Sequence, residues 1–261
     1  MKAVLRWLGL LVIALVALQL FFVLRIAAMA AINPESTTFQ RSEAWTLLAS
    51  KGHVPWRQQW VPYADISDHL KRAVIASEDD GFVNHDGVDW NAIEKAWERN
   101  AKAEALASKA QARAPERLVR APKIRGGSTI TQQLAKNLLL SGERTLLRKG
   151  QEFVLTLALE RLLSKQRILE IYLNNVEWGE GVFGAEAAAQ HYFRKSASRL
   201  STAEAARLAV MLPAPKRFEK TPGSAYLAGR TRTILGRMGS AELPCEAGEA
   251  SSGQRQSYQA S

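Results

Sequence analysis

The sequence predicts a mostly α-helical domain that follows a single N-terminal transmembrane helix. Three observations lead to this prediction: an uncharged apolar run near the N-terminus, several segments with helical apolar periodicity, and no segment that alternates like a half-buried strand. Of the 261 residues, 47% are hydrophobic and 23% are charged. That composition is typical of a globular domain and excludes a largely disordered chain.

The N-terminal apolar run has the length of a membrane span. Residues 7–24 carry no charge, and a helix of that length extends about 27 Å, close to the ~30 Å hydrocarbon core of a bilayer. Because Lys2 and Arg6 precede the run, we expect the N-terminus in the cytoplasm and the rest of the chain outside it. The alternative is a cleaved signal peptide with a small-residue site at 28–30, although the run exceeds the usual apolar length of such a peptide. Either interpretation exports the domain.

Changes of pattern divide the chain into four parts. We expect a cytoplasmic stub and anchor, an extended juxtamembrane segment, the folded domain and a disordered tail, at residues 1–32, 33–66, 67–239 and 240–261.

Apolar spacing and capping residues predict the helices of the domain. We expect helices at 68–79, 89–113, 143–163 and 165–174, one that begins after Gly126-Gly127-Ser128 with Ser128 as N-cap, and one opened by a capping box at 201–204. The segment 101–123, rich in Ala, Lys and Arg, is expected to be mobile, and the Gly-rich segment 178–184 is expected to be a loop.

The charge and cysteine content narrow the class of function. The net charge of +10 favours an anionic partner, which can be nucleic acid, lipid head groups or a phosphorylated substrate. We expect no nucleic-acid partner, since no recognisable motif for one occurs and the export signal argues against it. Cys245 is the single cysteine, which excludes an intramolecular disulfide and a cysteine metal cluster.

Glu78 is the first candidate for chemistry. It falls beside the apolar stripe of its predicted helix, three residues after Ile75. A carboxylate that borders a buried face needs hydrogen-bonding or charged partners, or else has a raised pKa, and this suits a general base. Asp79, Phe82 and His85 follow it in the string EDDGFVNHDG. The alternative is an acidic surface patch at the end of an ordinary helix.

A second candidate is the string GGSTITQQLAKN at 126–137. Its polar side chains gather on one face of the predicted helix, where hydroxyl and amide groups suit sugar hydroxyls and N-acetyl groups and an ammonium suits phosphate. These residues are Ser128, Thr129, Gln132, Gln133, Lys136 and Asn137. The alternative is a solvated polar face.

The string RKGQE supplies a third candidate. Arg148, Lys149 and Glu152 share a helix face at i, i+3 and i, i+4 spacing. Two cations beside a carboxylate suit a diphosphate whose charge grows as it leaves. The alternative is an exposed ion pair of a few tenths of a kcal/mol.

Together and in this order, the motifs resemble a known family. The strings EDDGFVNHDGVDW, GGSTITQQLAKNLLL, RKGQE, ILEIYLNNVEWGEGVFGAEAAAQHYF and RLAVMLPAP resemble the five motif regions of the family 51 peptidoglycan glycosyltransferases. The resemblance runs from about Pro62 to Phe218. The chain looks like the monofunctional branch, because about 40 residues follow Phe218 and they carry neither Ser-x-x-Lys nor Lys-Thr-Gly of the bifunctional relatives.

The resemblance implies a fold, a reaction and a location. The fold would be a lysozyme-like helical domain with a large lobe and a smaller, mobile lobe near the membrane. The acceptor would be lipid II and the donor the growing lipid-linked glycan chain, joined by a β-1,4 bond as undecaprenyl diphosphate leaves. The enzyme would be a single-pass protein of the bacterial inner membrane with a periplasmic domain, and other cell-wall synthesis or division proteins would be candidate partners.

The resemblance also implies roles for individual residues. Glu78 matches the general base, and Glu152 matches a second essential carboxylate near the diphosphate or its metal, Mg²⁺ or Mn²⁺. The phosphate-side cations would be Lys136, Arg148 and Lys149. The substrate contacts would be Asp79, Phe82, His85, Thr129 and Gln133.

The sequence departs from the family at Asp80, where many relatives carry a basic or other polar residue. A third negative charge at this point is expected to raise the pKa of Glu78 by repulsion.

The sequence leaves two other functions open. One is an enzyme that cleaves glycan with both carboxylates, and the other is a membrane scaffold that binds the lipid-linked precursor without catalysis.

Overall fold

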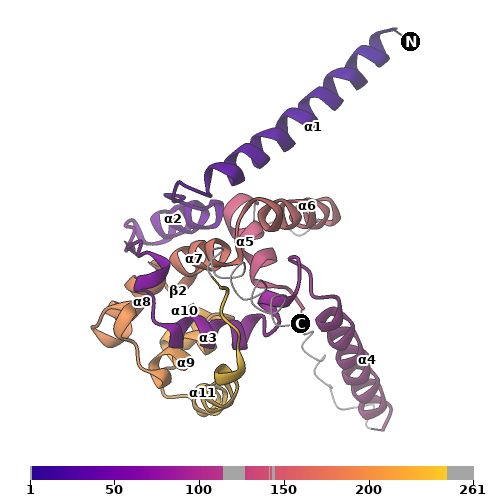
Figure 1. Cartoon of the computed structure of the whole chain (residues 1–261). Helices are drawn as coiled ribbons and strands as arrows, with labels where there is room; N and C mark the ends of the chain where they lie inside the picture. Colours follow the sequence, from indigo (N-terminus) through magenta and orange to yellow (C-terminus); the bar gives the residue numbers. More distant parts are fainter. Residues whose placement is uncertain (1, 114–126, 141, 143–144, 246–261) are drawn as a thin grey trace, which may run out of the picture.

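The computed structural model describes residues 2–113, 127–140, 142 and 145–245, and it is mostly helical (Figure 1). The predicted fold class is therefore confirmed. The helices are α1 (Lys2–Ala28), α2 (Thr38–Lys51), α3 (Asp68–Glu78), α4 (Trp90–Arg113), α5 (Ile130–Leu139), α6 (Leu146–Leu162), α7 (Lys165–Asn175), α8 (Ala185–Phe193), α9 (Thr202–Met211), α10 (Pro215–Lys220) and α11 (Ala225–Arg237). Among these residues, the short 3₁₀ turns are η1 (Tyr63–Asp65), η2 (Phe82–Asn84), η3 (Ala197–Arg199) and η4 (Met238–Ser240).

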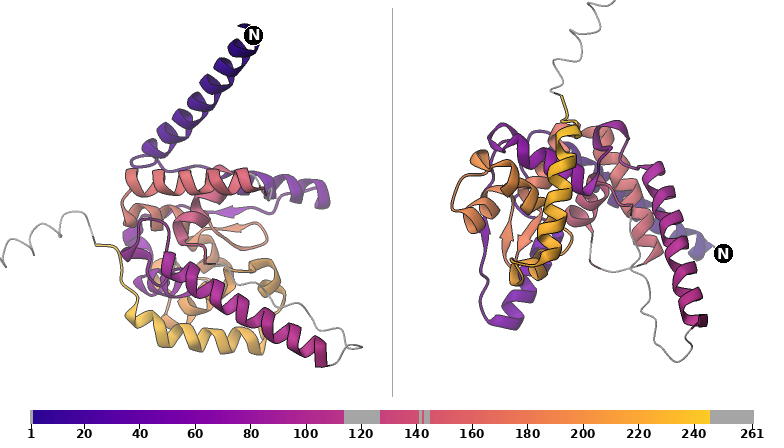
Figure 2. Two further views of the ribbon diagram at one scale, coloured as in Figure 1. Left: turned by 90° about the vertical axis from the view of Figure 1, so that its right-hand side faces the viewer. Right: turned by 90° about the horizontal axis from the view of Figure 1, so that it is seen from below.

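The helices pack in two groups that share one core. On the side from which α1 leaves the domain, α5 packs against α2, α6 and α7; on the opposite side, α3 packs against α9 and α11 (Figures 1 and 2). The core runs through both groups, and its largest fully buried side chains include Trp178 and Tyr172. Asn174, near the end of α7, joins this helix to the segment that contains Val61. Its side-chain amide accepts a hydrogen bond from Val61 N–H and donates one to Val61 C=O, both at 2.9 Å. The ILEIYLNN string is thus a packing element.

Helix α1 has the properties of a membrane span. It is the one helix of the described residues long and apolar enough to cross a bilayer, with a mean hydropathy of 2.7. Its last turn enters the domain, where Ile26 is buried. Gln19 lies within the apolar run of α1, and its side-chain amide exchanges hydrogen bonds of 3.0 and 3.1 Å with the amide of Gln151 on α6. These contacts dock α1 against α6.

Three short strands form a sheet that the sequence analysis did not predict. The order is β1 (Arg57–Gln58), β3 (Val182–Phe183), β2 (Glu177–Gly179), with β1 parallel and β2 antiparallel to β3. The Gly-rich segment 178–184 is therefore mostly a hairpin. At its turn, Gly181 has φ +70°, and a Cβ there would lie 1.7 Å from the carbonyl oxygen of Pro55. A side chain at this position would break the contact between the hairpin and β1.

Several predicted boundaries need correction. The segment 33–66, expected to be extended, contains α2, which a capping box of Thr37 and Gln40 opens. The helix predicted at 89–113 is confirmed as α4, which includes 101–113. Residues 114–123 lie outside the described residues, and the mobility expected of 101–123 stays a prediction. The expected tail begins too early, because Ala241 is buried and its carbonyl accepts from Arg72. The rest of that tail, 246–261, lies outside the described residues.

Two predicted helix starts also shift. The N-cap of α5 is Thr129, one residue after the predicted Ser128. Helix α6 begins at Leu146 with Thr145 as N-cap; of its predicted first residues, 143 and 144 lie outside the described part of the chain. The capping box of Ser201 and Glu204 is confirmed.

Candidate active site

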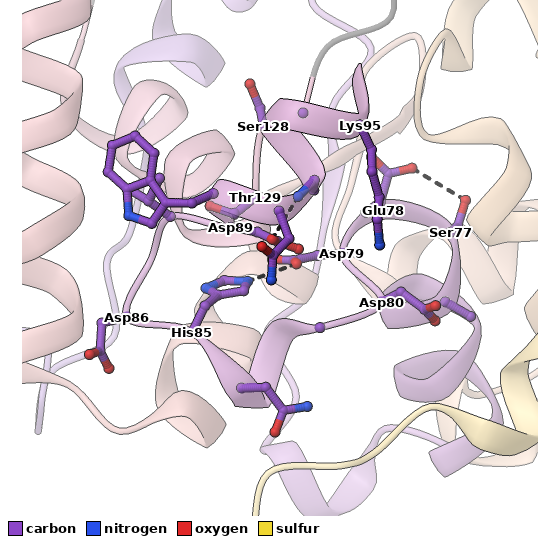
Figure 3. A pocket seen from close by; sticks show the side chains of 18 of the residues that line it. Ser77, Glu78, Asp79, Asp80, His85, Asp86, Asp89, Lys95, Ser128 and Thr129 are labelled. Carbon is purple, nitrogen blue, oxygen red and sulfur yellow. Dashed lines mark hydrogen bonds and ion pairs between the residues drawn. The ribbon is translucent and has the colours of Figure 1, made fainter. Parts of the chain in front are cut away.

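A groove of about 1030 Å³ opens where α3 ends (Figure 3). The end of α3, the turn η2, the start of α4, the residues before α5 and one face of α6 line it. Five of the predicted site residues line this groove: Glu78, Asp79, His85, Ser128 and Thr129. The first two predicted motifs therefore meet at one place, although more than forty residues separate them in the chain.

Glu78 is the last residue of α3 and faces the groove while protein surrounds most of its carboxylate. Burial raises its pKa, and the hydrogen bond that Gln133 Nε2 donates to Oε2 at 3.1 Å opposes part of that rise. Asp79 adds a smaller repulsion. A carboxylate in this state accepts a proton more readily than an exposed one, which is the property of a general base.

Asp79 joins the first motif to the second. Its Oδ2 accepts the Ile130 N–H at the start of α5 at 2.9 Å, and its Oδ1 pairs with His85 Nε2 at 2.8 Å. Gly87 N–H donates to His85 Nδ1, so the ring proton sits on Nε2 and points at Asp79. Both side chains line the groove, but these bonds already use their polar atoms. Their predicted role as substrate contacts stays a prediction, and their role in shaping the groove is evident.

Thr129 and Gln132 cap α5. The Thr129 hydroxyl accepts from Gln132 N–H at 3.1 Å and donates to the Gly87 carbonyl at 2.6 Å, while Gln132 Oε1 accepts from Thr129 N–H at 3.2 Å. The two side chains are buried. Thr129 and Gln132, two members of the predicted polar stripe, therefore stabilise the N-terminus of α5. Ser128, another member, is exposed and lines the groove.

The groove lining does not include five of the predicted substrate contacts: Phe82, Gln132, Gln133, Lys136 and Asn137. Phe82 is fully buried, with His85 against its edge and the Lys165 ammonium 4.6 Å from its ring centre, so it supports the groove from below. Lys136 is exposed and Asn137 is half-buried, both further along α5.

The third motif forms a separate cluster on α6. Glu152 is buried and binds Lys149 Nζ at 2.5 Å and Arg148 Nη1 at 3.4 Å. None of the three lines the groove, but Phe153 and Leu157 of the same helix do. Glu78 therefore lines the groove and Glu152 does not, so the two predicted carboxylates do not meet at this groove.

Sequence reasoning missed the cations that line the groove. Lys95 and Arg99 lie one turn apart on α4, and their i, i+4 spacing in the predicted helix was the signal for a shared face. Arg237 comes from the end of α11, and no local pattern marks it. It binds Asp80 at 3.0 Å, and both side chains are exposed. The predicted rise in the pKa of Glu78 is thus present, but burial and not Asp80 is its main cause.

The donor set for a metal ion is incomplete within the described residues. They hold no group of three or more His, Cys, Asp or Glu side chains placed to bind one ion. Mg²⁺ commonly uses one or two carboxylates together with substrate phosphates. The expected Mg²⁺ or Mn²⁺ stays a prediction.

Comparison with known proteins identifies a family. The family model described as Transglycosylase matches residues 46–239. The chain is 53% identical over 232 residues to a biosynthetic peptidoglycan transglycosylase of Paraburkholderia xenovorans (strain LB400), covering 89% of this chain and 90% of that protein. It is 51% identical over 245 residues to the protein of the same name from Herminiimonas arsenicoxydans, covering 94% and 99%. A third protein of that name, from Cupriavidus metallidurans (strain CH34), is 52% identical over 248 residues, covering 92% and 99%.

Proposed function

This chain belongs to the transglycosylase family of peptidoglycan-synthesising enzymes, and from that premise we propose that it polymerises lipid II with Glu78 as the general base. As a member of this family, the chain is a peptidoglycan glycosyltransferase that acts on lipid-linked glycan substrates at the membrane. The identity of the precursor and the roles of the residues are our proposal.

The proposed reaction is an inverting displacement. The carboxylate of Glu78 takes the proton of the 4-hydroxyl of lipid II, and that oxygen attacks the anomeric carbon of the growing chain. The bond between that carbon and the diphosphate breaks, so undecaprenyl diphosphate leaves and a β-1,4 bond remains. The observation that carries this proposal is the placement of Glu78, whose partly buried carboxylate has a raised pKa and faces a groove large enough for sugars.

The cluster of Arg148, Lys149 and Glu152 suits the leaving diphosphate. It lies on α6, the helix that α1 contacts, directly after Leu146 and Leu147, which are 92% and 88% exposed. Exposed leucines beside cations are typical of a surface that meets lipid head groups. We infer that Lys149, which is half exposed, approaches the diphosphate while Glu152 holds the two cations in place.

The anchor supports a location at the bilayer surface. With its N-terminus in the cytoplasm of a bacterial inner membrane, α1 would hold the groove on the periplasmic side, beside a substrate that is confined to the bilayer. Tethering of this kind raises the local concentration of the enzyme at its substrate. A divalent ion would act on the diphosphate, held by it and by one or two protein carboxylates.

The test is polymerisation of purified lipid II by the wild type, Glu78→Gln and Glu152→Gln, each with and without a divalent metal. Glu98→Gln on the exposed face of α4 is the matched control, because its side chain lies outside the groove. We expect glycan polymer from the wild type and the control, and a loss of at least about a hundredfold for Glu78→Gln. Polymer at the wild-type rate from Glu78→Gln would overturn the proposed base.

A further inference from the structure

Two hydrogen bonds in series connect the core of the domain to Glu78. The Tyr172 hydroxyl on α7 donates to Gln133 Oε1 on α5 at 3.0 Å, and Gln133 Nε2 donates to Glu78 Oε2 at 3.1 Å. Tyr172 is fully buried, and α5 packs directly against α7. Core packing therefore fixes the position of the hydroxyl from which this series begins.

The direction of both bonds follows from the groups involved. A carboxylate oxygen can only accept, so the amide nitrogen of Gln133 faces Glu78 and its amide oxygen faces Tyr172. Within the described residues, that amide oxygen is the acceptor of the Tyr172 hydroxyl. Rotating the amide by half a turn would place its oxygen against the carboxylate and leave the buried tyrosine O–H without an acceptor, which is unfavourable.

We propose that Tyr172 is a positioning residue: acting through Gln133, it holds Glu78 Oε2 as a fixed acceptor, so that Oε1 is the atom that takes the proton from the attacking hydroxyl. This inference rests on the proposed role of Glu78 as the base. Protonation of Oε2 would require the Gln133 amide to turn, because two donors cannot face each other. The other oxygen, Oε1, has only a long contact of 3.4 Å with the Ser77 hydroxyl among the described residues.

The surroundings of the series support this assignment. Burial raises the pKa of Tyr172 well above its ordinary value, with smaller contributions from Glu78 and Asp79, so the hydroxyl keeps its proton and stays a donor. The charged groups that shift the pKa of Glu78 are Arg230 on α11 and Asp79, the residue that follows α3. Neither contacts the amide of Gln133 within the described residues, so the orientation of that amide depends on Tyr172.

The experiment is the pH dependence of kcat/KM for lipid II polymerisation by Tyr172→Phe. Without the hydroxyl, the Gln133 amide can turn its oxygen toward a protonated Glu78, which favours the protonated form. We expect the acidic limb of the profile to move to higher pH by about one unit. At pH values on that limb, kcat/KM should fall about tenfold relative to the wild type, and at pH values well above it kcat/KM should change little. Gln133→Met removes the donor directly and should move the limb in the same direction. In the double variant, Tyr172→Phe should add nothing, because Tyr172 acts through Gln133.

Tyr63→Phe is the matched control. Its buried hydroxyl has no hydrogen-bond partner within the described residues, so its removal should leave the limb in place. Partial unfolding of any variant would lower the rate at every pH without moving the limb. An unmoved limb in both Tyr172→Phe and Gln133→Met, together with an inactive Glu78→Gln, would overturn the positioning role alone. Normal polymerisation by Glu78→Gln would instead overturn the proposed base.

Discussion

The carboxylate of Asp79 accepts the backbone N–H of Ile130 at 2.9 Å, and this buried bond fixes the start of α5 to the end of α3. Its other oxygen binds His85. The geometry of the groove therefore depends on a negative charge at the positive end of a helix, where a carboxylate is stabilised. Because Gln133 lies on α5, the same bond also determines how Gln133 meets Glu78.

Asp79→Asn should destabilise the domain and disrupt the groove. The amide offers one acceptor oxygen where the carboxylate offers two, so one of the two donors, Ile130 N–H or His85 Nε2–H, would face an NH₂ group. We expect a loss of about 2–3 kcal/mol in the free energy of unfolding, measured by denaturant titration, and a loss of activity. Asp89→Asn is the control for stability: Asp89 accepts the Ala92 N–H at the start of α4, and Asn caps helices as well as Asp does. Equal stability of Asp79→Asn and Asp89→Asn would contradict this account.

Glu78→Gln should separate stability from activity. Burial raises the pKa of Glu78 above its ordinary value of 4.5, so ionisation of this group opposes folding. That penalty is absent below about pH 4.5 and grows as the pH rises through the raised pKa. The inactive variant should thus have a higher Tm than the wild type at pH 8, and the difference should disappear near pH 4.5. A variant with a lower Tm at pH 8 would show that the carboxylate is stabilised by its partners more than burial penalises it.

The helices that the sequence predicted correctly are those whose signals are local. Apolar spacing indicated α3 and α7, and a capping box indicated α9. The start of α5 was missed by one residue because Ser128 and Thr129 are both good N-caps; the capping box of Thr129 with Gln132 was the deciding signal. The strands have two or three residues each, too short for an alternating pattern.

Site residues were predictable from the sequence only where a local motif marked them. Glu78 was marked by its place beside an apolar stripe, and its position at the groove agrees with that signal. The partner of Gln133 was not predictable, since the contact between Tyr172 and Gln133 arises from the packing of two helices that nearly forty residues separate. The same holds for Arg237 against Asp80.

The cations of α4 should act on the substrate through charge. Neutralising them in the double variant Lys95→Gln/Arg99→Gln is expected to raise KM for lipid II several-fold with a smaller change in kcat, because both residues line the groove. The dependence of KM on salt should become shallower, since fewer charges remain to be screened. Lys102→Gln, on the same helix but outside the groove, should keep both the wild-type KM and its salt dependence. An identical effect of Lys102→Gln would show that net charge, and not the groove, sets KM.

The contact between Gln19 and Gln151 predicts that the anchor stays on the mature protein and touches α6. Their amides exchange two hydrogen bonds across the α1–α6 contact. In a Cys245→Ser background, which removes the single native cysteine, Gln19→Cys/Gln151→Cys should form an intramolecular link with a short bifunctional thiol reagent in membranes. Ala17→Cys/Gln151→Cys is the control, because residue 17 lies about 200° away around the helix and should react poorly.

The same experiment decides between an anchor and a cleaved signal peptide. Cleavage near residues 28–30 would remove residue 19 from the mature chain, so a shortened protein without any link at either pair would contradict a retained span. A link at the first pair, by contrast, requires α1 and α6 to meet in the membrane-bound enzyme. Replacing Gln19 by Leu should then leave the span inserted, since Leu is more apolar, but should weaken the contact by about 1 kcal/mol. Because α6 carries Glu152 and also lines the groove through Phe153, we expect that loss to appear as a several-fold fall in polymerisation rate in membranes.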